Sequence, residues 1–208
     1  MERRLSIGKH TATRFVLAAA AALTMATTLW AQASFKSWPI HQAPPEYRAL
    51  ISRGDLIVVS LQDAVLRELQ DALSKSGAEG AIAFCHLDAT FTAQRLARHE
   101  GIAAGRTSDR LRNPTNAPRP WAADLVRAHA GERARSVDGF VVDLGDKVGL
   151  LRPISHRPMC NGCHGPAEGV SPGVKAVLAD RYPVDRAIGF TEGEIRGWFW
   201  VEVAKSPR

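Results

Sequence analysis

Residues 137–164 read VDGFVVDLGDKVGLLRPISHRPMCNGCH, and this segment carries the patterns that indicate the fold and the cofactor. Residues 137–144 and 148–154 are rich in apolar and β-branched residues, and Gly145-Asp146 separates them. This pattern predicts a β-hairpin. The segment ends in Cys160-Asn161-Gly162-Cys163-His164, which we expect on a short helical turn just beyond the hairpin.

Cys160–His164 has the form Cys-x-x-Cys-His, the pattern by which a c-type haem is attached to protein. The two thiols form thioether bonds with the porphyrin vinyl groups, and the histidine supplies one axial nitrogen to the iron. A structural zinc site needs four nitrogen or sulfur ligands, and Cys85 is the only further cysteine. A thioredoxin-like pair normally lies early in a βαβ unit. The motif therefore predicts one covalently attached haem c, with Cys160, Cys163 and His164 as binding residues.

The N-terminus has the features of a secretory signal peptide. Arg3, Arg4, Lys9 and Arg14 precede an uncharged run over residues 15–35, which contains the small-x-small pattern Ala31-Gln32-Ala33. We expect residues 1–33 to be removed after Ala33 and the protein to be periplasmic, where bacteria attach haem c. The alternative is an uncleaved membrane anchor, because the uncharged run is long enough to span a bilayer.

The remaining chain suits one domain with an ordinary core. The net charge of the 208 residues is +6, of which the four basic residues near the N-terminus and Glu2 contribute +3. The remainder is too weakly basic to indicate a nucleic-acid partner. We expect a linker and short helix over 34–54 and a haem domain over 55–208. Periodicity and turn residues predict helices over 55–76, 81–100, 121–130 and 174–179, and strands over 102–108 and 194–204.

The fold class is therefore α+β, with N-terminal helices followed by a small antiparallel sheet that carries the haem. A small all-helical cytochrome c is not expected, because no methionine is placed to be the second axial ligand. Met1 and Met25 lie in the signal peptide, and Met159 adjoins Cys160 on the attachment side. The other candidates are Cys85, His86, His41, His99, His129 and His156. Cys85 and His86 share the predicted helix 81–100, and adjacent helical positions differ by about 100°, which leaves Cys85, His86 and an open site as alternatives.

Four stretches together resemble one known family. They are Ala81–Cys85, the run from Gly105 to Trp121 (GRTSDRLRNPTNAPRPW), Cys160–Gly165 and the run from Arg181 to Phe190 (RYPVDRAIGF). The chain resembles, over about residues 55–205, the c-type haem domain family of PAS-like fold first described for a cyanobacterial protein. The resemblance implies cysteine/histidine axial ligation, with His164 and Cys85 as the metal ligands. His86 beside Cys85 and the Trp198-Phe199-Trp200 segment depart from the family pattern.

An anionic thiolate ligand stabilises ferric iron and lowers the reduction potential. We therefore expect a low-potential electron-transfer protein that acts with a periplasmic redox or signalling partner. The alternative is a haem-based redox or gas sensor for NO or CO, and a haem enzyme ranks third because no distal His-Arg pair is evident. Arg106 and Arg112, together with Arg110, are candidates to pair with the haem propionates.

Overall fold

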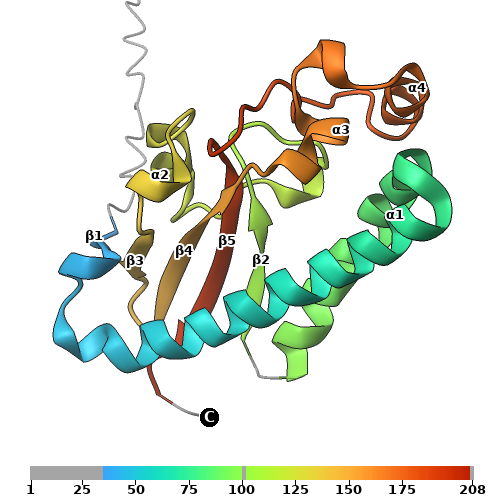
Figure 1. Cartoon of the computed structure of the whole chain (residues 1–208). Helices are drawn as coiled ribbons and strands as arrows, with labels where there is room; N and C mark the ends of the chain where they lie inside the picture. The colour runs from blue at the N-terminus through green and yellow to red at the C-terminus, as the bar shows by residue number, and fades with distance from the viewer. Residues whose placement is uncertain (1–34, 100–101, 207–208) are drawn as a thin grey trace, which may run out of the picture. The chain divides into compact units, whose positions relative to one another are not determined.

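The computed structural model describes residues 35–99 and 102–206, and over 83–99 it describes the helical backbone without the side chains. It has an α+β fold built on a five-stranded antiparallel sheet with the order β1-β3-β4-β5-β2 (Figure 1). The strands are β1 Ser37–Pro39, β2 Ala103–Thr107, β3 Phe140–Asp143, β4 Lys147–Ser155 and β5 Ile195–Ala204. The predicted β-hairpin is confirmed as β3 and β4, with Gly145 at φ 86° in the turn.

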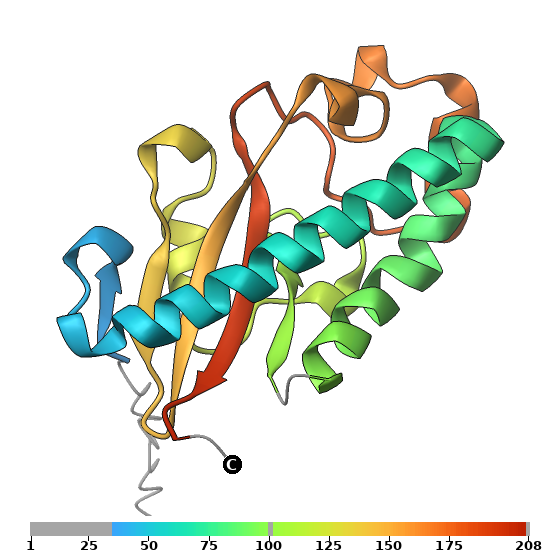
Figure 2. The same ribbon diagram turned by 60° about the horizontal axis from the view of Figure 1, so that its bottom comes forward.

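Helix α1 spans Arg48–His99 and consists of two arms that meet at Gly77. The first arm crosses one face of the sheet, and the second arm turns back toward β2 (Figures 1 and 2). Gly77 has φ 63° and ψ −171°, a conformation that only glycine adopts at low cost. The predicted break between two helices is thereby confirmed.

Two features differ from the sequence-based expectation at the N-terminal side. Part of the expected linker forms β1, whose Trp38 is paired with Val141 of β3. The helix expected from residue 55 also begins earlier, because α1 starts at Arg48 and continues through Gly54. Gly54 is explained by close packing, because a Cβ atom there would lie 2.8 Å from Cδ2 of Leu150.

A hydrophobic core lies on each face of the sheet, because successive side chains of a strand point to opposite faces. On one face, Leu61 and Val65 of α1 pack with Leu150 of β4 and with Val201 and Phe199 of β5. The opposite face is covered by helix α2, Ala123–Ala128, and by Trp121, which pack on inward residues such as Leu151 and Trp198. The alternation places Phe199 toward α1 and its neighbours Trp198 and Trp200 toward α2.

The connection from β4 to β5 holds the Cys-x-x-Cys-His motif. It contains α3, Asn161–His164, and α4, Pro172–Arg181, which begins at the N-cap Ser171. Val174, Leu178 and Tyr182 pack on Ile82 of the second arm of α1. Short 3-10 helices complete the fold: Ile40–Gln42, Pro45–Tyr47, Pro114–Asn116, Ala134–Ser136, Pro158–Cys160 and Ala167–Gly169. Within the described residues, no helix has the length and apolar character needed to cross a bilayer.

Candidate cofactor site

A cavity of about 1030 Å³, counted with its open mouth, lies between the two arms of α1, the sheet and the α3 segment. Leu66, Leu69 and Leu73 of the first arm line it and are only partly buried by protein. Ala81 and Ile82 of the second arm line it as well. The cavity combines apolar side chains with a few polar and charged groups, as small-molecule and cofactor sites do.

Cys160, Cys163 and His164 line the cavity together. Both cysteines are half-buried thiols rather than a disulfide. Cys160 is the N-cap of α3, and residues three apart in a helical turn lie on the same side. The chain turns sharply after His164, since a Cβ atom on Gly165 would lie 2.8 Å from the Asn161 carbonyl oxygen. This local structure presents two sulfurs and an imidazole to one space.

The His164 ring is held by a hydrogen bond of 2.8 Å between Nδ1 and the Ala187 carbonyl oxygen. Because a carbonyl can only accept, Nδ1 carries the proton and Nε2 keeps a lone pair for a metal. Burial lowers the pKa of His164 well below its ordinary value, and the charges of Arg196 and Arg112 lower it further. His164 is therefore neutral near pH 7, which is the state that coordinates metals.

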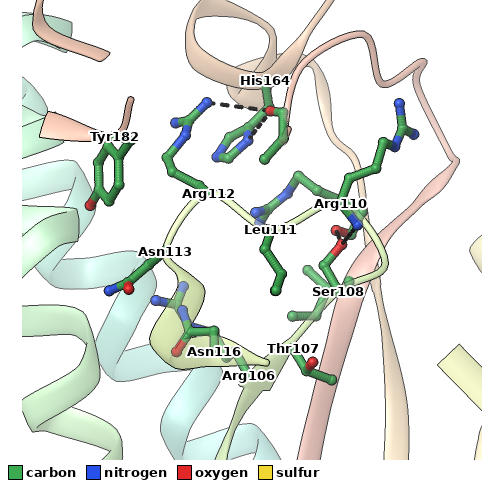
Figure 3. A pocket seen from close by; sticks show the side chains of 14 residues that line it. Arg106, Thr107, Ser108, Arg110, Leu111, Arg112, Asn113, Asn116, His164 and Tyr182 are labelled. Atoms are coloured by element: carbon green, nitrogen blue, oxygen red, sulfur yellow. Dashed lines mark hydrogen bonds between the residues drawn. The ribbon is translucent and has the colours of Figure 1, made fainter. Parts of the chain in front are cut away.

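Arg112 holds the segment around this ring together. Its Nε donates to Asp185 Oδ2 at 3.0 Å, and its Nη2 donates to the Cys163 carbonyl at 2.5 Å and the Ala187 carbonyl at 3.3 Å. Figure 3 shows Arg112 and His164 converging on one carbonyl oxygen. The predicted propionate contact of Arg112 stays a prediction, and the contacts that the structure gives it are to protein.

A second hollow, of about 650 Å³ counted with its open mouth, adjoins the first and is lined by several arginines (Figure 3). Arg106, Arg112, His164 and Arg196 line both hollows, and Arg110 lines the second. Arg157 lines the first. Arg106, Arg110 and Arg112 could be predicted because they lie in one run of the sequence. Arg157 and Arg196 could not, because they lie in separate parts of the chain and only the fold brings them to the same site.

Comparison with known proteins places this arrangement in a family. A family model described as Tll0287-like matches residues 16–204. The chain belongs to the Tll0287-like family. Among solved structures, the crystal structure of the cyanobacterial heme-protein Tll0287 matches with a TM-score of 0.56 and 20% identity, over 80% of this chain and 99% of that chain. That likeness shows a shared fold. No match was found among the curated proteins. The family resemblance inferred from the sequence is confirmed.

The histidines that the sequence offers as a second iron ligand lie in different parts of the fold. His41 is exposed, the His129 ring packs against the Phe140 ring in a tilted arrangement with centroids 4.7 Å apart, and buried His156 is hydrogen-bonded to Asn161 at 2.8 Å. Of the histidines whose side chains the structure describes, only His164 lines the cavity. The side chains of Cys85, His86 and His99 lie outside the described residues.

The residues of this site fit a c-type haem. Two thiols and a neutral histidine with an available Nε2 line the cavity, and partly buried leucines line it as well. The arginines that line the same cavity could pair with anionic propionates. The donor set also differs from that of a closed zinc site, which would need a fourth nitrogen or sulfur ligand beside these three.

Proposed function

We propose that this protein is a c-type haem protein, with one haem joined through thioethers to Cys160 and Cys163 and coordinated by His164. The observation that carries the proposal is the shared cavity, in which both thiols and the imidazole face a partly apolar space of about 1030 Å³. Bound there, a haem supplies one-electron exchange. The family membership and the heme-protein described for the similar structure support the same reading.

We further propose Cys85 as the second axial ligand. Ala81 and Ile82 of the second arm both line the cavity. Cys85 follows these two residues in the same arm of α1. The family resemblance supports cysteine/histidine ligation, with Cys85 in the place of the ligating cysteine.

A redox role follows from that ligand pair. Cys85 as a thiolate would donate electron density and hold the reduction potential low. The leucines of the first arm would limit water around the site, and Arg106 and Arg196 would balance the charge of the propionates. We therefore infer a low-potential electron-transfer protein of PAS-like fold rather than an enzyme.

Export and a partner belong to the same proposal. We propose that residues 1–33 direct the chain to the periplasm, where haem is attached, with membrane anchoring through this segment as the alternative. Electrons would pass to or from a separate periplasmic protein. The described part of the chain offers a contact region at the cavity mouth, where Met159 is 43% exposed and Arg157 is exposed as well.

A sensor is the second candidate, and the break in α1 favours it. The arm that carries Cys85 is joined to the first arm by a single non-helical residue, Gly77, and packs on α4 through Ile82. If Cys85 took a proton and left its ligand position on reduction, this arm would lose one of its attachments. A change in ligation would then become a change in the second arm, which a partner protein could detect.

The test is spectroscopy combined with redox titration of the matured protein and two variants. We expect a low-spin ferric spectrum of thiolate type that disappears in Cys85→Ala and survives in His86→Ala. His86→Ala is the matched control, because it changes the neighbouring position of the same helix. Loss of the spectrum in His86→Ala with retention in Cys85→Ala would refute the ligand assignment.

The same protein separates a carrier from a sensor. A carrier exchanges electrons quickly and keeps both axial ligands in the reduced state. A sensor binds CO or NO when reduced and changes its affinity for a partner. Reduced protein that neither binds these gases nor changes its ligation would exclude the sensor alternative.

A further inference from the structure

The Arg112–Asp185 pair connects three segments around His164. Both side chains are nearly buried, with 10% and 8% of their surface exposed. Asp185 accepts from Arg112 Nε through Oδ2 at 3.0 Å and from the Ala187 backbone N–H through Oδ1 at 2.8 Å. Arg112 in turn donates to the carbonyl groups of Cys163 and Ala187. The pair thus holds both α3, which carries the Cys-x-x-Cys-His motif, and Ala187, whose carbonyl accepts the hydrogen bond of His164.

We propose that Arg112 and Asp185 are positioning residues that set the strength of the His164–Ala187 hydrogen bond and, through it, the reduction potential of the site. This inference rests on the proposed haem function. It assigns Arg112 to the histidine side of the site rather than to a propionate, and it gives Asp185, which has no role in the motif, a defined effect on the iron.

The physical basis is competition for one carbonyl. The Ala187 oxygen accepts from His164 Nδ1 at 2.8 Å and from Arg112 Nη2 at 3.3 Å. A second, charged donor withdraws electron density from the acceptor, and a weaker acceptor leaves the imidazole less electron-rich. The hydrogen-bond partner of a ligating histidine tunes its basicity and hence the metal. Arg112 therefore raises the potential, both through this competition and through its charge.

Asp185 opposes that effect. Its carboxylate neutralises the guanidinium at close range, and both side chains are largely buried, where charges act more strongly than in water. It also fixes the Ala187 backbone, so that the carbonyl faces the ring. Removing either charge leaves the other uncompensated near His164. Loss of the Asp185 charge therefore raises the reduction potential, and loss of the Arg112 charge lowers it. Simple loosening of the loop would instead move the potential in one direction.

The experiment compares the potentials of Asp185→Asn and Arg112→Gln with that of the wild type. We expect the potential to rise in Asp185→Asn and to fall in Arg112→Gln. At a fixed applied potential, each change shifts the reduced-to-oxidised ratio about tenfold, equivalent to about 59 mV for one electron. Asp124→Asn, which breaks the exposed Arg127–Asp124 pair on α2, is the control and leaves the potential unchanged.

Arg112→Lys provides a second test if either variant fails to accumulate. Lysine keeps the charge that Asp185 needs, but it lacks the planar fork that serves Asp185 and two carbonyls at once. We expect a fall in potential smaller than that of Arg112→Gln, together with a resonance Raman shift that reports a stronger His164 hydrogen bond. An unchanged potential in Arg112→Lys, or shifts of the same sign in Asp185→Asn and Arg112→Gln, would overturn the inference.

The amount of haem that stays attached to the denatured chain is measured in every variant. Absence of attached haem in the wild type would refute the proposed function itself. Attached haem with no dependence of the potential on Arg112 and Asp185 would refute only the positioning role.

Discussion

Replacing Gly77 by alanine tests how the two arms of α1 are held over the cavity. Gly77 has φ 63° and ψ −171°, and an added Cβ atom would have no heavy atom within 4 Å. The cost is therefore backbone strain alone, about 1–3 kcal/mol for a non-glycine residue in such a region. Alanine also restricts the unfolded chain, which offsets roughly 0.4–1 kcal/mol. We expect a net destabilisation of about 1–2 kcal/mol, by the difference between these terms.

The assay is thermal and denaturant unfolding of the matured protein. For a chain of this length, the expected loss lowers the melting temperature by roughly 3–6 °C. Gly169→Ala is the matched control, because a Cβ atom added at Gly169 would likewise have no neighbour within 4 Å, while the backbone conformation there is ordinary. Equal stabilities of Gly77→Ala and Gly169→Ala would show that the strain at the junction of the arms is absent.

Two further changes test the packing and charges around the sheet. Leu61→Ala removes a fully buried side chain of the first arm and should lower the free energy of unfolding by about 2–5 kcal/mol. Leu56→Ala, at a side chain 70% exposed on the same arm, should lower it by less than about 0.5 kcal/mol. Equal losses of stability in urea unfolding would contradict the assigned face of α1. Hydrogen bonds from Lys205 and the Tyr47 hydroxyl hold the pKa of Asp143 well below its ordinary value. Asp143 therefore stabilises the fold above about pH 4, and this stabilisation is lost as the pH falls further. Asp143→Asn should be less stable at pH 7 by about 1–2 kcal/mol and should show a weaker loss of stability between pH 4 and pH 2.

Much of the fold could be predicted because local pattern and tertiary packing agree. The hairpin of β3 and β4 follows from two apolar runs around Gly145, and the break in α1 follows from a glycine with no side chain to favour helix. The start of α1 could not be predicted in the same way. Gly54 is a poor helix former, and it is tolerated because Leu150 of a strand far along the chain occupies the space beside it.

The site residues likewise include some that the sequence predicts and some that only the fold brings together. Cys160, Cys163 and His164 are adjacent in the chain, so their shared cavity could be predicted from the motif alone. The roles of Asp185 and the Ala187 carbonyl could not, because Ala187 contacts His164 and Asp185 contacts Arg112 only when the connection after α4 folds back. A backbone carbonyl also carries no signal in the sequence. The partly buried leucines of the first arm appear in the sequence as an ordinary core stripe, and only the structure shows that they face a cavity.

The central claim is that haem is covalently held by Cys160 and Cys163, and one measurement tests it most directly. The full chain is produced in a host that attaches haem c, then denatured and analysed by intact mass and by the spectrum of its pyridine haemochrome. We predict a mass increase of one haem per chain, with a spectrum indicating two thioether bonds, and loss of the attached haem in Cys160→Ala/Cys163→Ala. A denatured chain without haem, or haem retained in the double variant, would contradict the account.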